Sequence, residues 1–152
     1  MSAEGSYQAL AHRHECGGSA LYERVLAGLM SPLQARIVAE LPAPPEEIAS
    51  RLGLGGEAVL QELDNLFHRG IVNTRDVPGR QGYRFWGSTG LLWTYTLARA
   101  ELLGRSPEME TLWAEFVRQE WYAKLAQDYS KHPQPFDRVL PALRAVKGSP
   151  GL

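Results

Sequence analysis

The chain has 152 residues, enough for one hydrophobic core or for one domain with a helical extension. Sixteen lysines and arginines against seventeen aspartates and glutamates give a formal charge of -1, so the whole molecule is not a general binder of polyanions. A hydrophobic fraction of 44% is typical of soluble globular proteins, and no apolar run approaches the roughly 18 residues of a membrane span. We expect a cytoplasmic protein, because the first residues lack a secretory pattern and the single cysteine, Cys16, cannot form an internal disulfide.

Residues 1–18 are mostly small or polar and end in two glycines, which predicts a flexible N-terminal arm. Within this arm His12, His14 and Cys16 occupy alternate positions, so an extended backbone would place them on one face. A metal site there would need a fourth ligand and an ordered frame. We therefore expect solvated histidines and no metal, with stoichiometric zinc uptake as the alternative.

Residues 19–86 combine helical periodicity with turn signals. A first helix begins at Ser19, and a second begins at Ser31-Pro32, where serine suits the N-cap and proline the first helical position. Two short helices follow, at about 45–52 and 57–69, and a glycine-rich turn joins them. This pair matches helix-turn-helix geometry.

The spacing of apolar residues changes from a helical to an alternating pattern after the last of these helices. An extended segment begins at Ile71-Val72, Val77-Pro78-Gly79 supplies a turn, and Tyr83 to Trp86 alternate as a returning strand. Helices followed by a hairpin are the chain order of a winged helix. We therefore predict an α+β fold: a mainly helical winged helix-turn-helix over 19–86 with a two-stranded wing.

Residues 87–129 are predicted to form a helical extension, and the Pro- and Gly-rich residues 130–152 an extended or disordered tail. The extension contains a second serine–proline start, Ser106-Pro107, followed by a helix with a wide set of large side chains. We expect that helix to serve packing, a homodimer interface or both, through Trp113, Phe116, Trp121 and Tyr122.

A set of residues between Pro44 and Trp86 carries a family resemblance. They are Glu47-Ile48-Ala49, Leu52-Gly53-Leu54, Val59, Leu63, Leu66, Gly70-Ile71-Val72 and the hairpin through Tyr83. This pattern resembles the winged-helix domains of ArsR/MarR-type regulators over less than a third of the chain. The resemblance is informative about fold and says little about the task.

A longer pattern runs from about Leu21 to Pro141. Its parts are the predicted wing, Leu91 to Tyr95, Ser106-Pro107-Glu108, the aromatic helix and Pro135 to Pro141. This order is similar to a prokaryotic family in which a winged-helix half precedes a ferredoxin-like iron–sulfur half. The cysteines that would bind the cluster in that family are absent here, so no redox role or cofactor is carried over. The chain is either a stand-alone relative or a piece of a longer protein.

The leading functional hypothesis is a DNA-binding regulator that acts on double-stranded DNA as a homodimer. The helix 57–69 would enter the major groove, where Gln61 and Asn65 can pair with base edges. The remaining candidate DNA contacts are Arg69, at the end of this helix, and three wing arginines that would bind phosphates: Arg75, Arg80 and Arg84.

The charges are unequal between the two elements. The wing carries three arginines and one aspartate, whereas residues 55–70 carry one arginine and three carboxylates, which would repel phosphates. The alternative is therefore a non-enzymatic interaction or dimerisation module that binds a partner protein. Neither hypothesis involves a membrane or a cofactor, and no arrangement of residues indicates a catalytic site.

Overall fold

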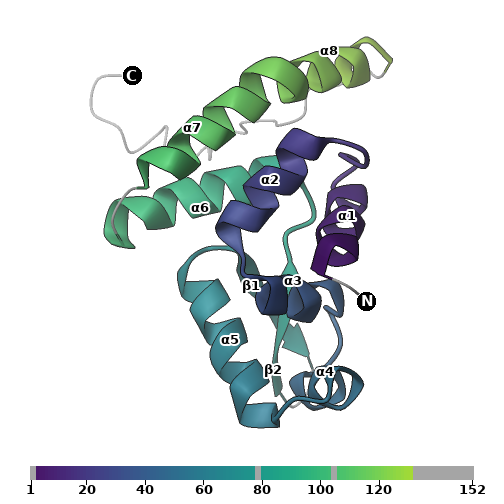
Figure 1. Cartoon of the computed structure of the whole chain (residues 1–152), viewed down its shortest axis with the longest axis vertical. Coiled ribbons are helices and arrows are strands. Elements are labelled where there is room, and N and C mark those ends of the chain that lie inside the picture. The colour runs from purple at the N-terminus through teal and green to yellow at the C-terminus, as the bar shows by residue number, and fades with distance from the viewer. Residues whose placement is uncertain (1–2, 78–79, 104–105, 132–152) are drawn as a thin grey trace, which may run out of the picture. The chain divides into compact units, whose positions relative to one another are not determined.

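The computed structural model describes residues 3–77, 80–103 and 106–131 (Figure 1). The side chains of residues 3, 75–77, 80–81, 101–103 and 128–129 are not described. The chain divides into two compact units, Met1–Arg118 and Gln119–Leu152. The described part is mostly helical with one two-stranded antiparallel sheet, as the α+β prediction requires. Its elements in chain order are α1 (Ala3–Arg13), α2 (Ala20–Leu29), α3 (Pro32–Ala39), α4 (Pro45–Leu52), α5 (Gly56–His68), β1 (Val72–Val77), β2 (Arg80–Phe85), α6 (Thr89–Leu103), α7 (Pro107–Phe116), the π-helix η1 (Val117–Trp121) and α8 (Tyr122–Lys131).

Local capping explains where several of these helices begin and end. Ser31 and Gln34 form a capping box, in which each side chain accepts a hydrogen bond from the other residue's backbone N–H. Gly53 ends α4 in the left-handed conformation, at φ 67°. The start of α7 at Ser106-Pro107 follows the prediction, because the Ser106 hydroxyl accepts from the backbone N–H of Met109.

The predicted hairpin is confirmed. Strands β1 and β2 pair antiparallel, with Val72 opposite Phe85 and Thr74 opposite Tyr83. The predicted turn at Pro78-Gly79 lies outside the described residues. Helix α5 packs against α3, α4 and β1 (Figure 1). The buried side chains of α5 lie along one face of the helix. These side chains are Val59, Leu63 and Leu66.

The predicted flexible arm over residues 1–18 is wrong. Most of this segment forms α1, which packs against α2 and α3, and the side chain of Leu10 is fully buried. The Arg13 guanidinium donates to backbone carbonyls at the end of α3, including that of Leu41 at 2.9 Å, and it lies over the ring of Phe85. Tertiary contacts therefore order a segment whose composition alone favours flexibility.

Helices α2 and α7 form an aromatic part of the core in the unit Met1–Arg118. The Tyr22 ring lies 4.8 Å from that of Phe116 and 6.3 Å from that of Trp113, measured between centroids. Both partners are almost fully buried. On α6 it is Leu92 that faces inward, whereas Leu91 and Tyr95 are each more than two-fifths exposed.

The unit Gln119–Leu152 contains α8 in its described part. Trp121 is half-buried and its ring stacks on that of Tyr122, which is 59% exposed. Helix α8 covers residues 122–131 and so runs two residues past the predicted end of the helical extension at 129. The remainder of the predicted tail, 132–152, lies outside the described residues.

Candidate functional site

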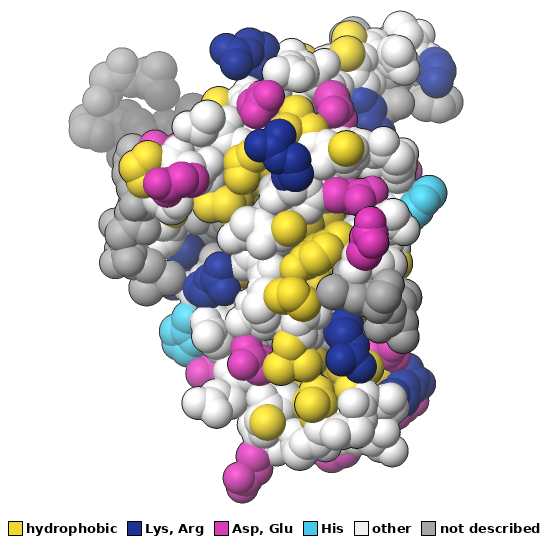
Figure 2. Space-filling view, in the orientation of Figure 1, with side chains coloured by type: hydrophobic (Ala, Val, Ile, Leu, Met, Phe, Trp, Pro, Cys, Tyr) yellow, Lys and Arg dark blue, Asp and Glu magenta, His cyan; other side chains and the backbone are white. Residues whose placement is uncertain are grey.

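The outward face of α5 is the surface to which the functional hypotheses assign contact. Because the apolar stripe of this amphipathic helix packs inward, the positions opposite it point to solvent. These positions are all exposed: Glu57, Gln61, Asp64 and His68. In Figure 2 acidic side chains are visible over the end of the molecule where Figure 1 places α4 and α5.

The two polar side chains predicted to contact bases, Gln61 and Asn65, are both exposed. They therefore have the accessibility that a surface contact needs. Leu60 is 43% exposed on the same helix and adds an apolar group beside the carboxylates. The α5 surface thus combines negative charge, amides and one leucine. We call Glu57, Leu60, Gln61, Asp64 and Asn65 the α5 face.

Arg69, one of the candidate DNA contacts, is partly buried and hydrogen-bonded within the protein. Its guanidinium donates to the backbone carbonyl of Leu29 at 2.5 Å and to Oε1 of Gln34 at 3.4 Å. Burial lowers its pKa from the ordinary value, and the negative charge of Glu62 acts in the opposite direction. The Glu62 carboxylate itself accepts from Nε2 of Gln34 at 2.8 Å. A phosphate contact by Arg69 would therefore compete with two hydrogen bonds, one to the end of α2 and one to the first turn of α3.

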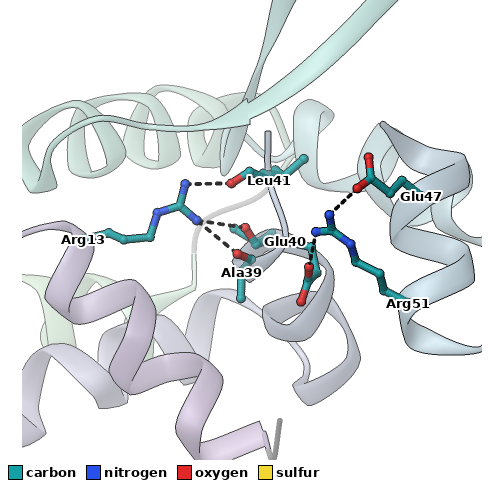
Figure 3. A network of polar contacts seen from close by, with 7 residues as sticks. Arg13, Ala39, Glu40, Leu41, Glu47 and Arg51 are labelled. Atoms are coloured by element: carbon teal, nitrogen blue, oxygen red, sulfur yellow. Dashed lines mark hydrogen bonds and ion pairs between the residues drawn. The ribbon is translucent and has the colours of Figure 1, made fainter. Parts of the chain in front are cut away.

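Arg51 on α4 is also engaged by carboxylates. Its guanidinium pairs with Glu40 at 2.9 Å and with Glu47 one turn earlier (Figure 3). The two carboxylates raise the pKa of this exposed arginine, mainly through the hydrogen bond that Arg51 donates to Glu40. The positive charge of Arg51 is thus balanced locally, and residues 45–68 contain no other arginine or lysine. Asp64 lies 3.5 Å from Nδ1 of His68, one turn later on α5.

The hairpin supplies one described cation among the candidate DNA contacts, the exposed Arg84 on β2. The side chains of Arg75 and Arg80 lie outside the described residues. Tyr83 precedes Arg84 on β2. Burial first, and then the negative charge of Asp64, raise the pKa of its phenol.

The four aromatic residues predicted for packing or dimerisation divide into two groups. Trp113 and Phe116 are buried against Tyr22 within the unit Met1–Arg118, so a second copy cannot reach most of their surface. Trp121 and Tyr122 lie in the other unit, and only Tyr122 is largely exposed.

The His12, His14 and Cys16 segment is ordered, contrary to the expectation of solvated histidines. His14 is buried and hydrogen-bonded through both ring nitrogens, and Cys16 is buried with its sulfur 3.5 Å from the Thr89 hydroxyl. Only His12 is exposed. Among the described residues, no group of three or more His, Cys, Asp or Glu side chains is arranged to hold a metal ion.

Comparisons of the chain with protein-family models, with curated proteins and with solved structures found no match. The resemblances described above therefore rest on the quoted residues alone. Within the described residues, every helix is too short or too polar to cross a lipid bilayer.

Sequence reasoning missed the inward role of Arg69 and the pairing of Arg51. The pairing of Arg51 had a visible signal in the sequence, because Glu47 and Arg51 are spaced i,i+4 on a helix, with the acid at the N-terminal position. The inward role of Arg69 had no such signal, since its acceptor, the carbonyl of Leu29, lies 40 residues away in the chain.

Proposed function

We propose that the unit Met1–Arg118 is a non-enzymatic winged-helix module whose α5 face binds a basic segment of a partner protein. The order of three helices and a hairpin, together with the turn between α4 and α5, supports the winged-helix assignment. The choice of partner depends on the charge of the α5 face.

The observation that carries this proposal is the pair of exposed carboxylates on α5, Glu57 and Asp64. The arginines Arg51 and Arg69 are engaged elsewhere, and the one basic group near Asp64 among the described residues is the exposed His68. A carboxylate about 4 Å from a phosphate costs on the order of 1 kcal/mol in water, and the same carboxylate gains a similar amount beside a lysine. Because phosphate contacts supply most of the affinity for DNA, these acids oppose a duplex and favour a cationic peptide. Leu60 gives the partner an apolar contact.

A DNA-binding regulator is the second candidate. The exposed amides of Gln61 and Asn65 and the exposed Arg84 favour it, because amides can pair with adenine edges and an arginine on a wing can contact phosphate. Such a regulator would bind as a homodimer with the two copies of α5 about one duplex turn apart.

One titration separates the two candidates. Fluorescence anisotropy would follow binding of the full chain to two labelled probes: a mixed-sequence duplex, and a soluble peptide in which lysine and leucine alternate. We expect the peptide to bind more tightly than the duplex at physiological salt. The double variant Glu57→Gln/Asp64→Asn should weaken peptide binding several-fold, because it removes both charges from the α5 face.

The matched control is Glu4→Gln, which removes an exposed carboxylate from α1. If Glu4→Gln weakens peptide binding as much as the double variant does, the peptide is attracted to the negative charge of the whole protein and the proposal fails. Duplex binding that falls steeply with salt and weakens on Arg84→Ala would support the second candidate instead.

A further inference from the structure

A pocket opens in the unit Met1–Arg118 where α6 and α7 meet the end of α2 and the junction between α5 and β1. Its cavity volume is about 140 Å³. It is distinct from the α5 face, because none of the residues that define that face lines it. The lining is mostly apolar, from Leu29, Ile71, Leu97, Met109 and Trp113.

The size and lining fit one small ring. Ile71 and Trp113 are almost fully buried, so the deeper walls are rigid parts of the core. Apolar cavities of roughly 150 Å³ in other proteins bind benzene, which is the scale of this one. A ligand with an apolar body of about that size is therefore accommodated without rearrangement of the core.

Two arginines give the pocket a positive wall. Arg99 is half-buried, and it makes no hydrogen bond or ion pair with any other residue that the structure describes. Its Cγ lies close to the backbone of Gly70, which holds the base of the side chain in place. Arg69 uses two of its five N–H donors on Leu29 and Gln34.

One carboxylate, Glu110, also lines the pocket, and it already interacts with another group of the chain. Among the side chains that the structure describes in this pocket, the charge without a partner is therefore that of Arg99. A half-buried guanidinium beside an apolar cavity gains from a planar anion, which can accept two parallel hydrogen bonds.

We propose that this pocket binds a small aromatic or aliphatic carboxylate, with the apolar body among Leu97, Met109 and Trp113 and the carboxylate on Arg99. The inference does not depend on what the α5 face binds. It predicts a ligand of one negative charge and about ten non-hydrogen atoms, a size that follows from the cavity volume.

Two-dimensional ¹⁵N NMR of the full chain tests the proposal with three probes of similar shape: benzoate, benzamide and benzylamine. Benzoate should give saturable shifts at the backbone signals of Leu97 and Arg99 and at the indole N–H of Trp113. Benzamide should bind about tenfold more weakly, because it lacks the charge, and benzylamine should not bind. Equal affinity for benzoate and benzamide, or no saturable shift with benzoate, would overturn the assignment.

The variant Arg99→Gln should weaken benzoate binding about tenfold or more and leave benzamide binding nearly unchanged. Arg24→Gln is the matched control, since it removes an exposed arginine from α2 in the same unit. If both variants weaken benzoate equally, the effect is one of net charge and the pocket assignment is wrong. Should Arg99→Gln disturb the fold, the comparison of benzoate, benzamide and benzylamine on the unmodified chain still tests whether the pocket binds a carboxylate.

Discussion

His14 and Trp86 are joined by a hydrogen bond that spans 72 residues of sequence, from Nε2 of the imidazole to the backbone carbonyl at 2.7 Å. Because a carbonyl can only accept, Nε2 carries the proton, and Nδ1 of the neutral ring accepts from the Tyr22 hydroxyl at 2.5 Å. The ring also stacks on Phe85, with centroids 4.5 Å apart. One buried imidazole thus connects the end of α1 with α2 and the end of the hairpin.

Replacing this imidazole should destabilise the protein substantially. In His14→Ala the Tyr22 hydroxyl and the Trp86 carbonyl both lose a buried partner, and a cavity remains beside Phe85. We expect the free energy of unfolding to fall by about 2–4 kcal/mol in urea titrations. His12→Ala, at an exposed position two residues earlier, should cost less than about 0.5 kcal/mol. Equal losses from the two variants would show that the buried network contributes nothing.

The same residue makes stability depend on pH. Burial lowers the pKa of His14, and the nearby Arg13 charge acts in the same direction, whereas the hydrogen bond to the Trp86 carbonyl opposes them. The unfolded chain therefore takes up this proton at a higher pH than the folded protein does. The contribution to stability is complete above the ordinary histidine pKa of about 6.5 and decreases as the pH falls from there through the lowered value.

The check is the free energy of unfolding at several pH values between about 7.5 and 5. His14→Gln keeps an amide donor and acceptor in the pocket but cannot titrate, so its stability should decline less steeply than that of the unmodified chain. Parallel curves for the two proteins would mean that other groups cause the dependence.

Local signals in the sequence predicted the central part of the fold. Ser31-Pro32 marks a helix start because the serine side chain caps the backbone N–H of Gln34 and proline fits the first helical position. Val72 and Phe85 fall in segments where the hydrophobic pattern changes from helical to alternating. Each of these features depends on neighbours within a few residues. Such features can be recognised without knowing the tertiary structure.

The features that the sequence could not predict depend on residues far apart in the chain. The order of α1 depends on partners such as Leu41, 28 residues from Arg13, and composition carries no record of that contact. The hydrogen bond from Arg69 to the carbonyl of Leu29 joins residues 40 positions apart, so no local pattern indicates it. The sequence predicted which helix or strand carries each candidate DNA contact. It could not predict which of these side chains are exposed to solvent.

Because α1 belongs to the core, core substitutions in it should affect global stability. The side chain of Leu10 is completely buried, and Leu10→Ala should lower the free energy of unfolding by about 2–5 kcal/mol. Gln8→Ala, at an exposed position on the same helix, should change it by less than about 0.5 kcal/mol. A small effect of Leu10→Ala, together with rapid amide exchange over residues 3–13, would instead agree with a loosely attached arm.

Two glycines with positive φ allow conformational strain to be separated from steric conflict. Gly53 has φ +67°, and a Cβ added there would meet no atom within 4 Å. Gly70 has φ +74°, and a Cβ would lie 2.6 Å from the backbone carbonyl oxygen of Tyr95 on α6. Gly53→Ala should therefore cost only the left-handed conformation, about 1–2 kcal/mol, which urea titration would measure.

Gly70→Ala should cost more, because the α5–β1 junction must move away from α6 in addition to accepting the strained backbone. We expect a further loss of about 1–3 kcal/mol relative to Gly53→Ala. The Trp86 indole N–H donates to the Gly70 carbonyl at 2.8 Å, so a shift of the junction should also move the indole N–H signal of Trp86 in NMR spectra. Equal losses for the two variants, with an unchanged Trp86 signal, would mean that α6 does not approach the junction as closely as the structure indicates.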